Sequence, residues 1–179
     1  MPGAIKSVVT KFVAQLCPEC ALCCNGVLFK DVELQPGDDG VKLKALGLPI
    51  SKSRRERFPQ PCAALDGCTC RVYADRPVRC RDFDCALLQS LAAGETESRE
   101  ALRVVRQTRE RAEKVRRLLR QLGDTVEPVA LSLRFQRVRR RLESLQWADE
   151  QAEIFGQLTL AVHDLNLMLR RHFYPDAKD

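Results

Sequence analysis

All nine cysteines of the 179-residue chain lie between Cys17 and Cys85. The first four are arranged as C-x2-C-x2-C-C, at Cys17, Cys20, Cys23 and Cys24. Two thiolates separated by two residues can point at one metal ion across a tight turn, which is why this spacing recurs in zinc and iron–sulfur sites. The spacing therefore predicts that the N-terminal half of the chain is built around bound metal.

Disulfide bonds are the other common use of many cysteines, and they need an oxidising compartment and normally a secretory signal. Residues 1–16 interleave lysines with apolar residues, which is typical of an amphipathic helix rather than of a signal segment. The odd cysteine count and the adjacent pair Cys23 and Cys24 also suit disulfide pairing poorly. No stretch approaches the roughly 20 apolar residues that span a membrane. We therefore expect a cytoplasmic protein with free or metal-bound thiols and no membrane segment.

The later cysteines continue the pattern, the last four within the run CTCRVYADRPVRCRDFDC. A C-x2-C-x2-C-C motif followed by a lone Cys, a Cys before a hydrophobic-Tyr pair, Arg-Pro and Cys-Arg-x-Phe resembles the YkgJ-like cysteine-cluster family of zinc- or iron-chelating proteins. The resemblance covers roughly residues 17–85 and implies metal binding rather than a named reaction. The cysteines that it implies as metal-site residues are Cys17, Cys20, Cys23, Cys24, Cys62, Cys70 and Cys80. Cys68 and Cys85 match the motifs less clearly.

Eight thiolates would fill two four-thiolate sites and leave one cysteine over. Side chains of adjacent residues in extended backbone point to opposite sides, so Cys23 and Cys24 can face different sites. We take Cys85 as the eighth ligand. Cys68 is the expected non-ligand, because it lies only two positions before Cys70 and lacks a clear family counterpart.

The choice between iron and zinc rests on the first three cysteines. Cys17, Cys20 and Cys23 resemble the ferredoxin-type C-x2-C-x2-C run, in which one loop holds three corners of a [4Fe–4S] cluster. This favours an iron–sulfur cluster, although the proline that usually follows the last cysteine is missing, and zinc remains the alternative. Either group with four thiolates carries a formal charge of about −2, which needs compensation when buried. Arg71, Arg76, Arg79 and Arg81 lie among the ligands and could supply it, and we take Arg76, Arg79 and Arg81 as the cofactor-binding residues.

The second half of the chain is helical in pattern. Apolar residues recur at spacings of three, four and seven in residues 98–122, 128–147 and 149–173, with Gly123 as the cap of the first helix. Short connections make these helices neighbours, with Leu118, Leu142, Leu158 and Leu165 in their core. The predicted fold is mainly α: an irregular cysteine-cluster metal-binding region (1–91) packed beside a three-helix, bundle-like region (92–179). We expect His163 to pack in the core and His172 to interact with the helix terminus.

The net charge is +6, and residues 99–120 hold nine basic residues against three glutamates. Those residues, with the arginines of 134–141, could bind nucleic acid. Interleaved glutamates and few aromatic residues favour a solvated helix face instead. The preferred function is a metal-binding cysteine-cluster protein whose iron–sulfur cluster serves redox, protein-modifying or metal-handling chemistry. The alternative is a zinc-stabilised binding module whose basic helices engage nucleic acid or a protein partner. The sequence identifies no catalytic residue and no oligomeric state.

Overall fold

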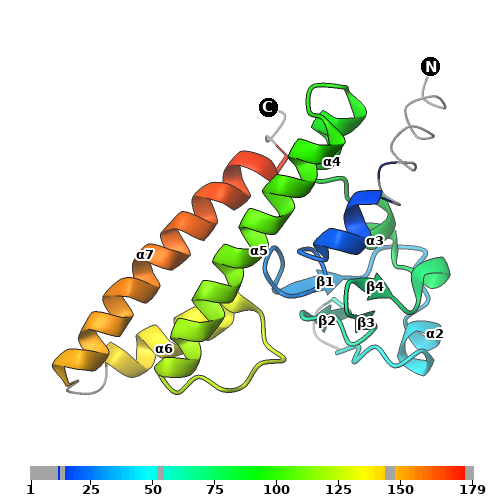
Figure 1. Cartoon of the computed structure of the whole chain (residues 1–179). Coiled ribbons are helices and arrows are strands. Elements are labelled where there is room, and N and C mark those ends of the chain that lie inside the picture. The colour runs from blue at the N-terminus through cyan, green and yellow to red at the C-terminus, as the bar shows by residue number, and fades with distance from the viewer. Residues whose placement is uncertain (1–11, 13–14, 52–54, 144–147, 176–179) are drawn as a thin grey trace.

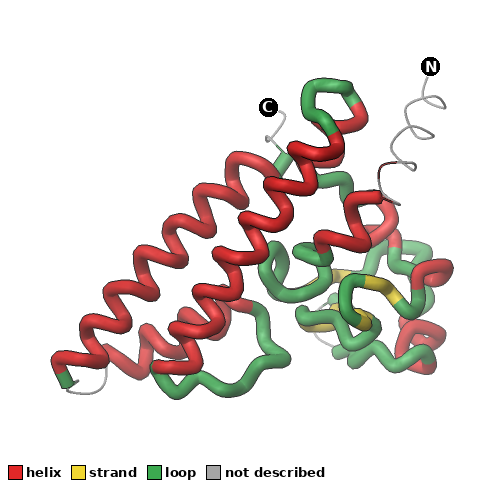
Figure 2. Tube along the Cα trace, in the orientation of Figure 1, coloured by secondary structure: helices red, strands yellow, loops and turns green. Residues whose placement is uncertain are grey.

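The computed structural model describes residues 12, 15–51, 55–143 and 148–175 of the chain (Figure 1). Helices dominate, and the short strands are confined to the cysteine-containing half (Figure 2). The prediction of a mainly α protein is confirmed. No helix in the described ranges is long and apolar enough to cross a membrane.

The C-terminal half consists of α5 (Ser98–Gln121), α6 (Leu131–Glu143) and α7 (Asp149–His172). Helices α5 and α7 run side by side, and α6 lies near one end of the pair (Figure 1). Helix α5 buries an apolar stripe that repeats every three or four residues, as the sequence predicts. The stripe comprises Ala101, Val104, Val105, Thr108, Ala112, Val115, Leu118 and Leu119. The three predicted helices are therefore present.

Helix α5 ends in a cap built on Gly123, which has a φ of +76°. The backbone N–H of Gly123 donates to the carbonyl oxygen of Arg120 at 2.8 Å, and that of Asp124 donates to the carbonyl oxygen of Leu119 at 2.9 Å. This pair of hydrogen bonds is the Schellman arrangement, which favours glycine at the left-handed position. The predicted cap is confirmed.

Helix α6 begins at Leu131, three residues later than the sequence pattern predicts. The connection before it is held by a buried ion pair, in which Arg134 Nε donates to Asp124 Oδ2 at 2.6 Å. Arg134 Nη2 also donates to the Asp124 carbonyl oxygen at 2.8 Å, and Arg137 Nε donates to Asp124 Oδ1 at 2.7 Å. The residues that follow Pro128 thus form part of a connection organised around Asp124. Arg134, which the sequence offered as a phosphate-binding candidate, is 1% exposed and has a structural role.

The cysteine half is made of short elements. Strand β1 (Asp31–Glu33) pairs antiparallel with β2 (Arg57–Pro59), and β3 (Leu65–Asp66) pairs antiparallel with β4 (Thr69–Cys70). Between and after them lie α2 (Gly40–Ala45), the 3₁₀ helix η1 (Tyr73–Asp75), α3 (Val78–Asp82) and α4 (Ala86–Ala92). The three short α-helices were missed because each is too brief to show a helical period.

Two hydrophobic cores underlie this arrangement. The larger one joins residues of the first half, such as Leu22 and Leu88, to the stripes of α5 and α7. The smaller one lies within the cysteine half and has only six buried residues: Val32, Leu43, Leu48, Phe58, Ala64 and Val72. Leu118, Leu158 and Leu165 are buried as predicted, whereas Leu142 is only partly buried. The larger core therefore crosses the region of the predicted boundary near residue 91.

Candidate metal centre

The first four cysteines are placed by a helical turn and the tight loop that follows it. Residues 15–20 are helical, and Ala21 then takes a left-handed φ of +54°, which turns the chain back. The backbone N–H of Cys24 donates to the Ala21 carbonyl oxygen at 2.9 Å. Leu22 anchors the loop because its side chain is completely buried. The spacing predicted a turn that gathers these thiols, and the structure contains one.

The remaining cysteines reach the loop from separate elements. The backbone N–H of Cys62 donates to the carbonyl oxygen of Cys24 at 2.7 Å, which fixes these two segments side by side. Cys70 ends β4, Cys80 lies in α3, and Cys85 is the residue before the first turn of α4. Residues distant in sequence thus surround the C-x2-C-x2-C-C loop.

A first set of four thiols consists of Cys17, Cys20, Cys23 and Cys85. Burial of the thiol, followed by the charge of Cys85, raises the pKa of Cys17 to about 11, although the residue as a whole is exposed. Burial and the charges of Cys85 and Cys17 raise the pKa of Cys20 to about 12. Burial and then Cys20 and Cys85 raise the pKa of Cys23 well above its usual value. These effects indicate that the four thiols lie in one region of the molecule, where the charge of Cys24 also contributes to the raised pKa of Cys23.

A second set consists of Cys24, Cys62, Cys70 and Cys80. Burial and then the charges of Cys62, Cys80 and Cys70 raise the pKa of Cys24 to about 12. Burial, Cys62 and Cys70 raise the pKa of Cys80 to about 11. Burial is also the main cause of the raised pKa of Cys62, with Cys70 contributing. The eight predicted ligands thus form two sets that adjoin at Cys23 and Cys24, and Cys17 of the first set also contributes to the raised pKa of Cys24.

Cys68 has a different environment from the other eight cysteines. It follows Gly67 in the two-residue turn between β3 and β4, where Asp66 pairs with Thr69. Its Sγ accepts a hydrogen bond from Nη1 of Arg109 at 3.3 Å. Its assignment as the non-ligand remains a prediction, and its position at a hairpin turn favours it.

Arg76 is a predicted arginine whose charge acts on a thiol of each set. Its charge partly opposes the burial that raises the pKa of Cys17 and of Cys80. Its guanidinium lies over the Tyr73 ring, 3.6 Å from the centroid, and its Nε donates to the Tyr73 carbonyl oxygen at 3.0 Å. Arg81 Nη1 in turn donates to the Arg76 carbonyl oxygen at 2.7 Å. Arg76 thus acts on one thiol of each set while its side chain is held by Tyr73.

The other predicted arginine, Arg79, lies near β1, where its charge helps to lower the pKa of Glu33 after the larger effect of Arg55. Two further arginines also act on thiols: Arg71, which the sequence analysis names as a possible source of positive charge, and Arg109, which it does not connect with the cysteines. The charge of Arg109 in α5 lowers the pKa of Cys20 and so partly offsets the effect of burial. Its Nη1 donates to the Glu19 carbonyl oxygen at 2.6 Å. The charge of Arg71 likewise lowers the pKa of Cys62 against the effect of burial. No spacing signal links α5 to the cysteine loop, because about 90 residues separate Arg109 from Glu19.

The nine cysteines are free thiols. Among the residues that the structure describes, no group of three or more His, Cys, Asp and Glu side chains is positioned to hold a metal ion. The donor chemistry nevertheless fits a thiophilic metal, because each set consists of four cysteines and thiolate sulfur is a preferred ligand of zinc and of iron–sulfur clusters. A thiol with a raised pKa is protonated at neutral pH, and a bound cation reverses that preference. Metal binding therefore stays a prediction that the donor set supports.

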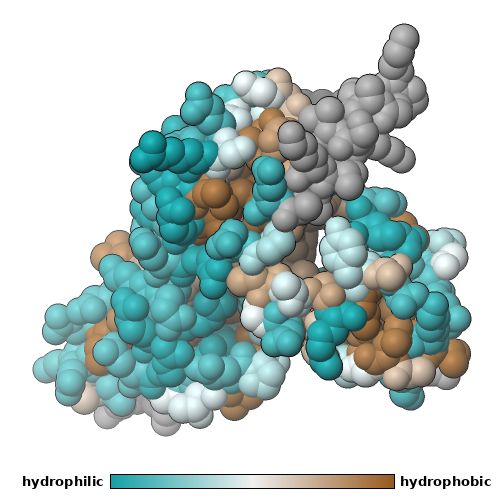
Figure 3. Space-filling model, turned by 45° about the vertical axis from the view of Figure 1, so that its right-hand side comes forward, coloured by the Kyte–Doolittle hydropathy of each residue, from teal (hydrophilic) through white to brown (hydrophobic). Residues whose placement is uncertain are grey.

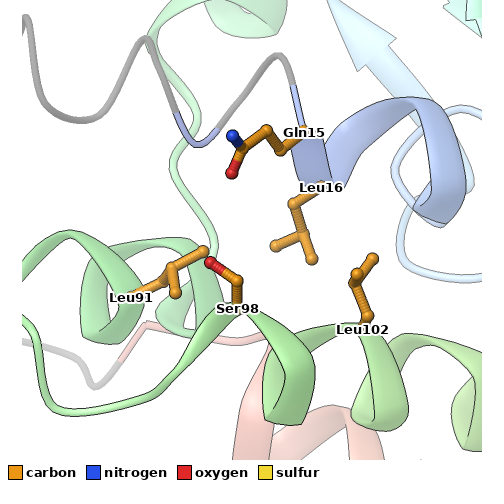
Figure 4. A pocket seen from close by; sticks show the side chains of 5 residues that line it. All are labelled: Gln15, Leu16, Leu91, Ser98 and Leu102. Carbon is orange, nitrogen blue, oxygen red and sulfur yellow. The ribbon is translucent and has the colours of Figure 1, made fainter.

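A pocket lies where residues 15–16 approach α4 and α5 (Figure 4). Its described lining residues come from residues 15–16, α4 and α5: Gln15, Leu16, Leu91, Ser98 and Leu102. None of these residues carries a charge or a thiol. The pocket therefore offers packing surface rather than catalytic groups.

Several arginines of α5 are engaged in ion pairs, including Arg116 with Glu113. Arg103 Nη2 contacts Glu100 Oε1 at 2.6 Å, and Arg111 Nε contacts Asp164 Oδ2 at 2.9 Å. Arg120 pairs with both Glu113 and Glu127, at 2.7 and 2.8 Å. Hydrophilic residues cover most of the helical half in Figure 3. These observations favour the solvated-face interpretation over nucleic-acid binding.

The histidines lie away from the cysteine sets. His163 is exposed on α7, so the prediction that it packs in the core was wrong. The stripe of α7 that faces the core is formed by Leu158, Ala161 and Leu165, and His163 lies on the other side. His172 is half-buried in the last turn of α7, as expected from its position.

Comparison with known proteins gives no relative for this chain. No family model, no curated protein and no solved structure matches it.

Proposed function

We propose that the chain binds metal in two separate four-cysteine sites that meet at the Cys23–Cys24 peptide bond. The observation that carries the proposal is that separate segments bring Cys85 to act on Cys17, Cys20 and Cys23, and bring Cys62, Cys70 and Cys80 to act on Cys24. The motif resemblance over residues 17–85 points the same way. Nine free thiols also suit a reducing compartment, so we place this chemistry in the cytoplasm.

The first set is proposed to hold a [4Fe–4S] cluster. Cys17, Cys20 and Cys23 have the ferredoxin-type spacing, and Cys85 is the distant fourth ligand that such a run requires. The cluster, when bound, supplies electron transfer for redox, protein-modifying or metal-handling chemistry. The chain's own contribution is a buried environment next to the larger core, which contains Cys20 and contacts Cys23 and Cys85.

The second set is proposed to hold zinc. Its cysteines join four separate segments, and Cys62, Cys70 and Cys80 pack against the smaller core. A core of six buried residues and strands of two or three residues provides little folding free energy. Closed four-cysteine zinc sites supply such free energy in small, irregular regions. The assignment gives the second set a structural role.

Arginines at the two sets would compensate the charge of the thiolates. Arg76 acts on Cys17 and Cys80, Arg109 on Cys20, and Arg71 on Cys62, as described above. A buried four-thiolate site of about −2 formal charge is unfavourable without such partners. The alternative function, a basic module for nucleic acid, has less support, because four arginines of α5 are engaged in ion pairs and Arg134 is buried.

Anaerobic purification followed by metal and sulfide analysis tests the proposal. We expect brown protein with broad absorbance near about 400 nm, together with iron, sulfide and zinc. Cys20→Ser should lose the iron and the colour, and Cys68→Ser is the matched control that should keep the full metal content. Wild-type protein free of metal after anaerobic purification, or a Cys20→Ser variant with full iron content, would contradict the proposal.

A further inference from the structure

The side of α7 that faces away from the core carries exposed leucines. Helix α7 packs against α5 through Leu158, Ala161 and Leu165, and it lies at the edge of the molecule in Figure 1. On the opposite side Leu160 is 72% exposed and Leu167 is 54% exposed. Single exposed leucines are ordinary on protein surfaces. These two are one heptad apart on the same helix, which places them on one line.

The line extends in a regular pattern to both ends of the helix. Steps of three, four, three, four and three residues connect six exposed positions, which is the a/d spacing of a coiled coil. We call these positions the outer seam of α7: Glu153, Gly156, Leu160, His163, Leu167 and Arg170. The seam has an acidic residue toward the N-terminus of the helix, leucines in the middle and a basic residue toward the C-terminus. A face of this pattern is complementary to itself when one copy is reversed.

We propose that the outer seam binds the outer seam of a second copy of this chain, with the two α7 helices antiparallel. In the register that places a positions opposite d positions, Glu153 lies opposite Arg170 and Gly156 lies opposite Leu167. Leu160 then lies opposite His163. Two-fold symmetry repeats each pair, so the contact has two ion pairs at its ends and the four leucines between them.

Gly156 supports this register. A Cβ at Gly156 would meet no atom within 4 Å, so space is open beside its backbone for a leucine from the second copy. Small residues let helices approach closely and accept a large side chain from the partner. The ion pair of Asp164 with Arg111 lies beside the seam and is compatible with the pairing, since neither residue belongs to it.

Charge complementarity selects a second copy in the antiparallel orientation as the occupant. A parallel pair would place Glu153 beside Glu153 and Arg170 beside Arg170, and like charges across such a contact are unfavourable. An unrelated helix would need its own matching charges, whereas this chain already contains both signs at the required positions. The inference does not depend on the proposed metal sites.

Sedimentation velocity of the full metal-containing chain over a range of concentrations tests the proposal. We expect a concentration-dependent dimer, and we expect Leu160→Lys and Leu167→Lys each to raise its Kd at least about tenfold, since each would place an ammonium group in the contact, opposite His163 or Gly156. Leu133→Lys is the matched control, because Leu133 is an exposed leucine of α6 outside the seam. It should leave the Kd unchanged.

A charge exchange tests the orientation. Glu153→Arg and Arg170→Glu should each weaken the dimer, and the double variant should restore it, because the opposed charges are exchanged but still complementary. Circular dichroism should show the same helicity in every variant, which separates loss of dimer from loss of fold. A chain that is monomeric at every concentration, a dimer that withstands both leucine variants, or a double variant without recovery would each overturn the proposal.

Discussion

Removal of the Asp124 carboxylate should be among the most destabilising single changes in the helical half. Asp124 is 4% exposed and accepts hydrogen bonds from Arg134, which is 1% exposed, and from Arg137. Asp124→Ala would leave the Arg134 guanidinium buried without a counter-ion. Breaking a buried pair in this way costs about 3–5 kcal/mol, whereas the partly exposed Arg137 can turn to water.

Urea unfolding followed by far-ultraviolet circular dichroism measures this effect. With a slope of about 2 kcal/mol per molar urea, the midpoint should fall by about 1.5–2.5 M. Glu100→Gln is the matched control, because it removes a carboxylate from the exposed pair with Arg103 and should leave the midpoint unchanged within error. The double variant Asp124→Leu/Arg134→Met should recover much of the loss, since apolar residues of similar size can replace a buried pair.

A shift in the urea midpoint of Asp124→Ala no larger than that of Glu100→Gln would refute the reasoning. It would mean that the Arg134 guanidinium reaches water or another acceptor in the variant. A double variant less stable than Asp124→Ala alone would also contradict it, because the cost would then come from packing rather than from unpaired charge.

Three further predictions concern the thiols and the loop that carries them. Burial raises the pKa of Cys17 to about 11 and that of Cys20 and Cys24 to about 12, whereas thiols of the unfolded chain ionise near 9. Unfolding therefore releases protons in this range, and the metal-free fold should lose stability as the pH rises from about 9 to 12. Urea midpoints that stay level across this range would contradict this prediction. Gly26→Ala should lower the free energy of unfolding by about 1–3 kcal/mol in urea, because Gly26 has a φ of +77° and a Cβ there would approach the Ala130 Cα at 3.0 Å. Gly47→Ala is the control for backbone strain alone, because Gly47 also has a positive φ but an added Cβ would meet nothing within 4 Å. It should lower the free energy of unfolding by less. Arg76→Gln should weaken metal binding at both sets by roughly 10–100-fold in competition with a chelator, while Arg140→Gln on the exposed side of α6 should not; equal affinities for the two variants would remove Arg76 from the sites.

The features that the sequence predicts well are those with a long repeat. The apolar period of α5 and α7 extends over 24 residues each, so their existence and buried stripes follow from it. The start of α6 does not, because the buried pair of Asp124 and Arg134 sets it through tertiary contact. Short elements such as α3, with five residues, contain less than two turns and give no periodic signal.

In the candidate site, too, sequence spacing predicts some features, whereas others depend on tertiary contacts. The prediction that Cys23 and Cys24 face different sites assumed extended backbone, whereas both residues lie in the turn that follows Ala21, so it stays a prediction. The membership of Cys85 in the first set depends on where the chain returns before α4, which no local spacing encodes. Arg109 is likewise out of reach of motif reasoning, because its contact with Glu19 joins α5 to the cysteine loop across the fold. The exposed position of His163 reflects which side of α7 faces α5.

The metal content of Cys85→Ser and Cys80→Ser, measured side by side after anaerobic purification, tests the two-site account most directly. Cys85 belongs to the first set and Cys80 to the second, although only five residues separate them in sequence. The account predicts that Cys85→Ser loses iron, sulfide and visible absorbance but keeps zinc, and that Cys80→Ser loses zinc but keeps the iron–sulfur spectrum. Loss of the same metal in both variants would show that Cys80 and Cys85 bind in one site, and would contradict the division at Cys23 and Cys24.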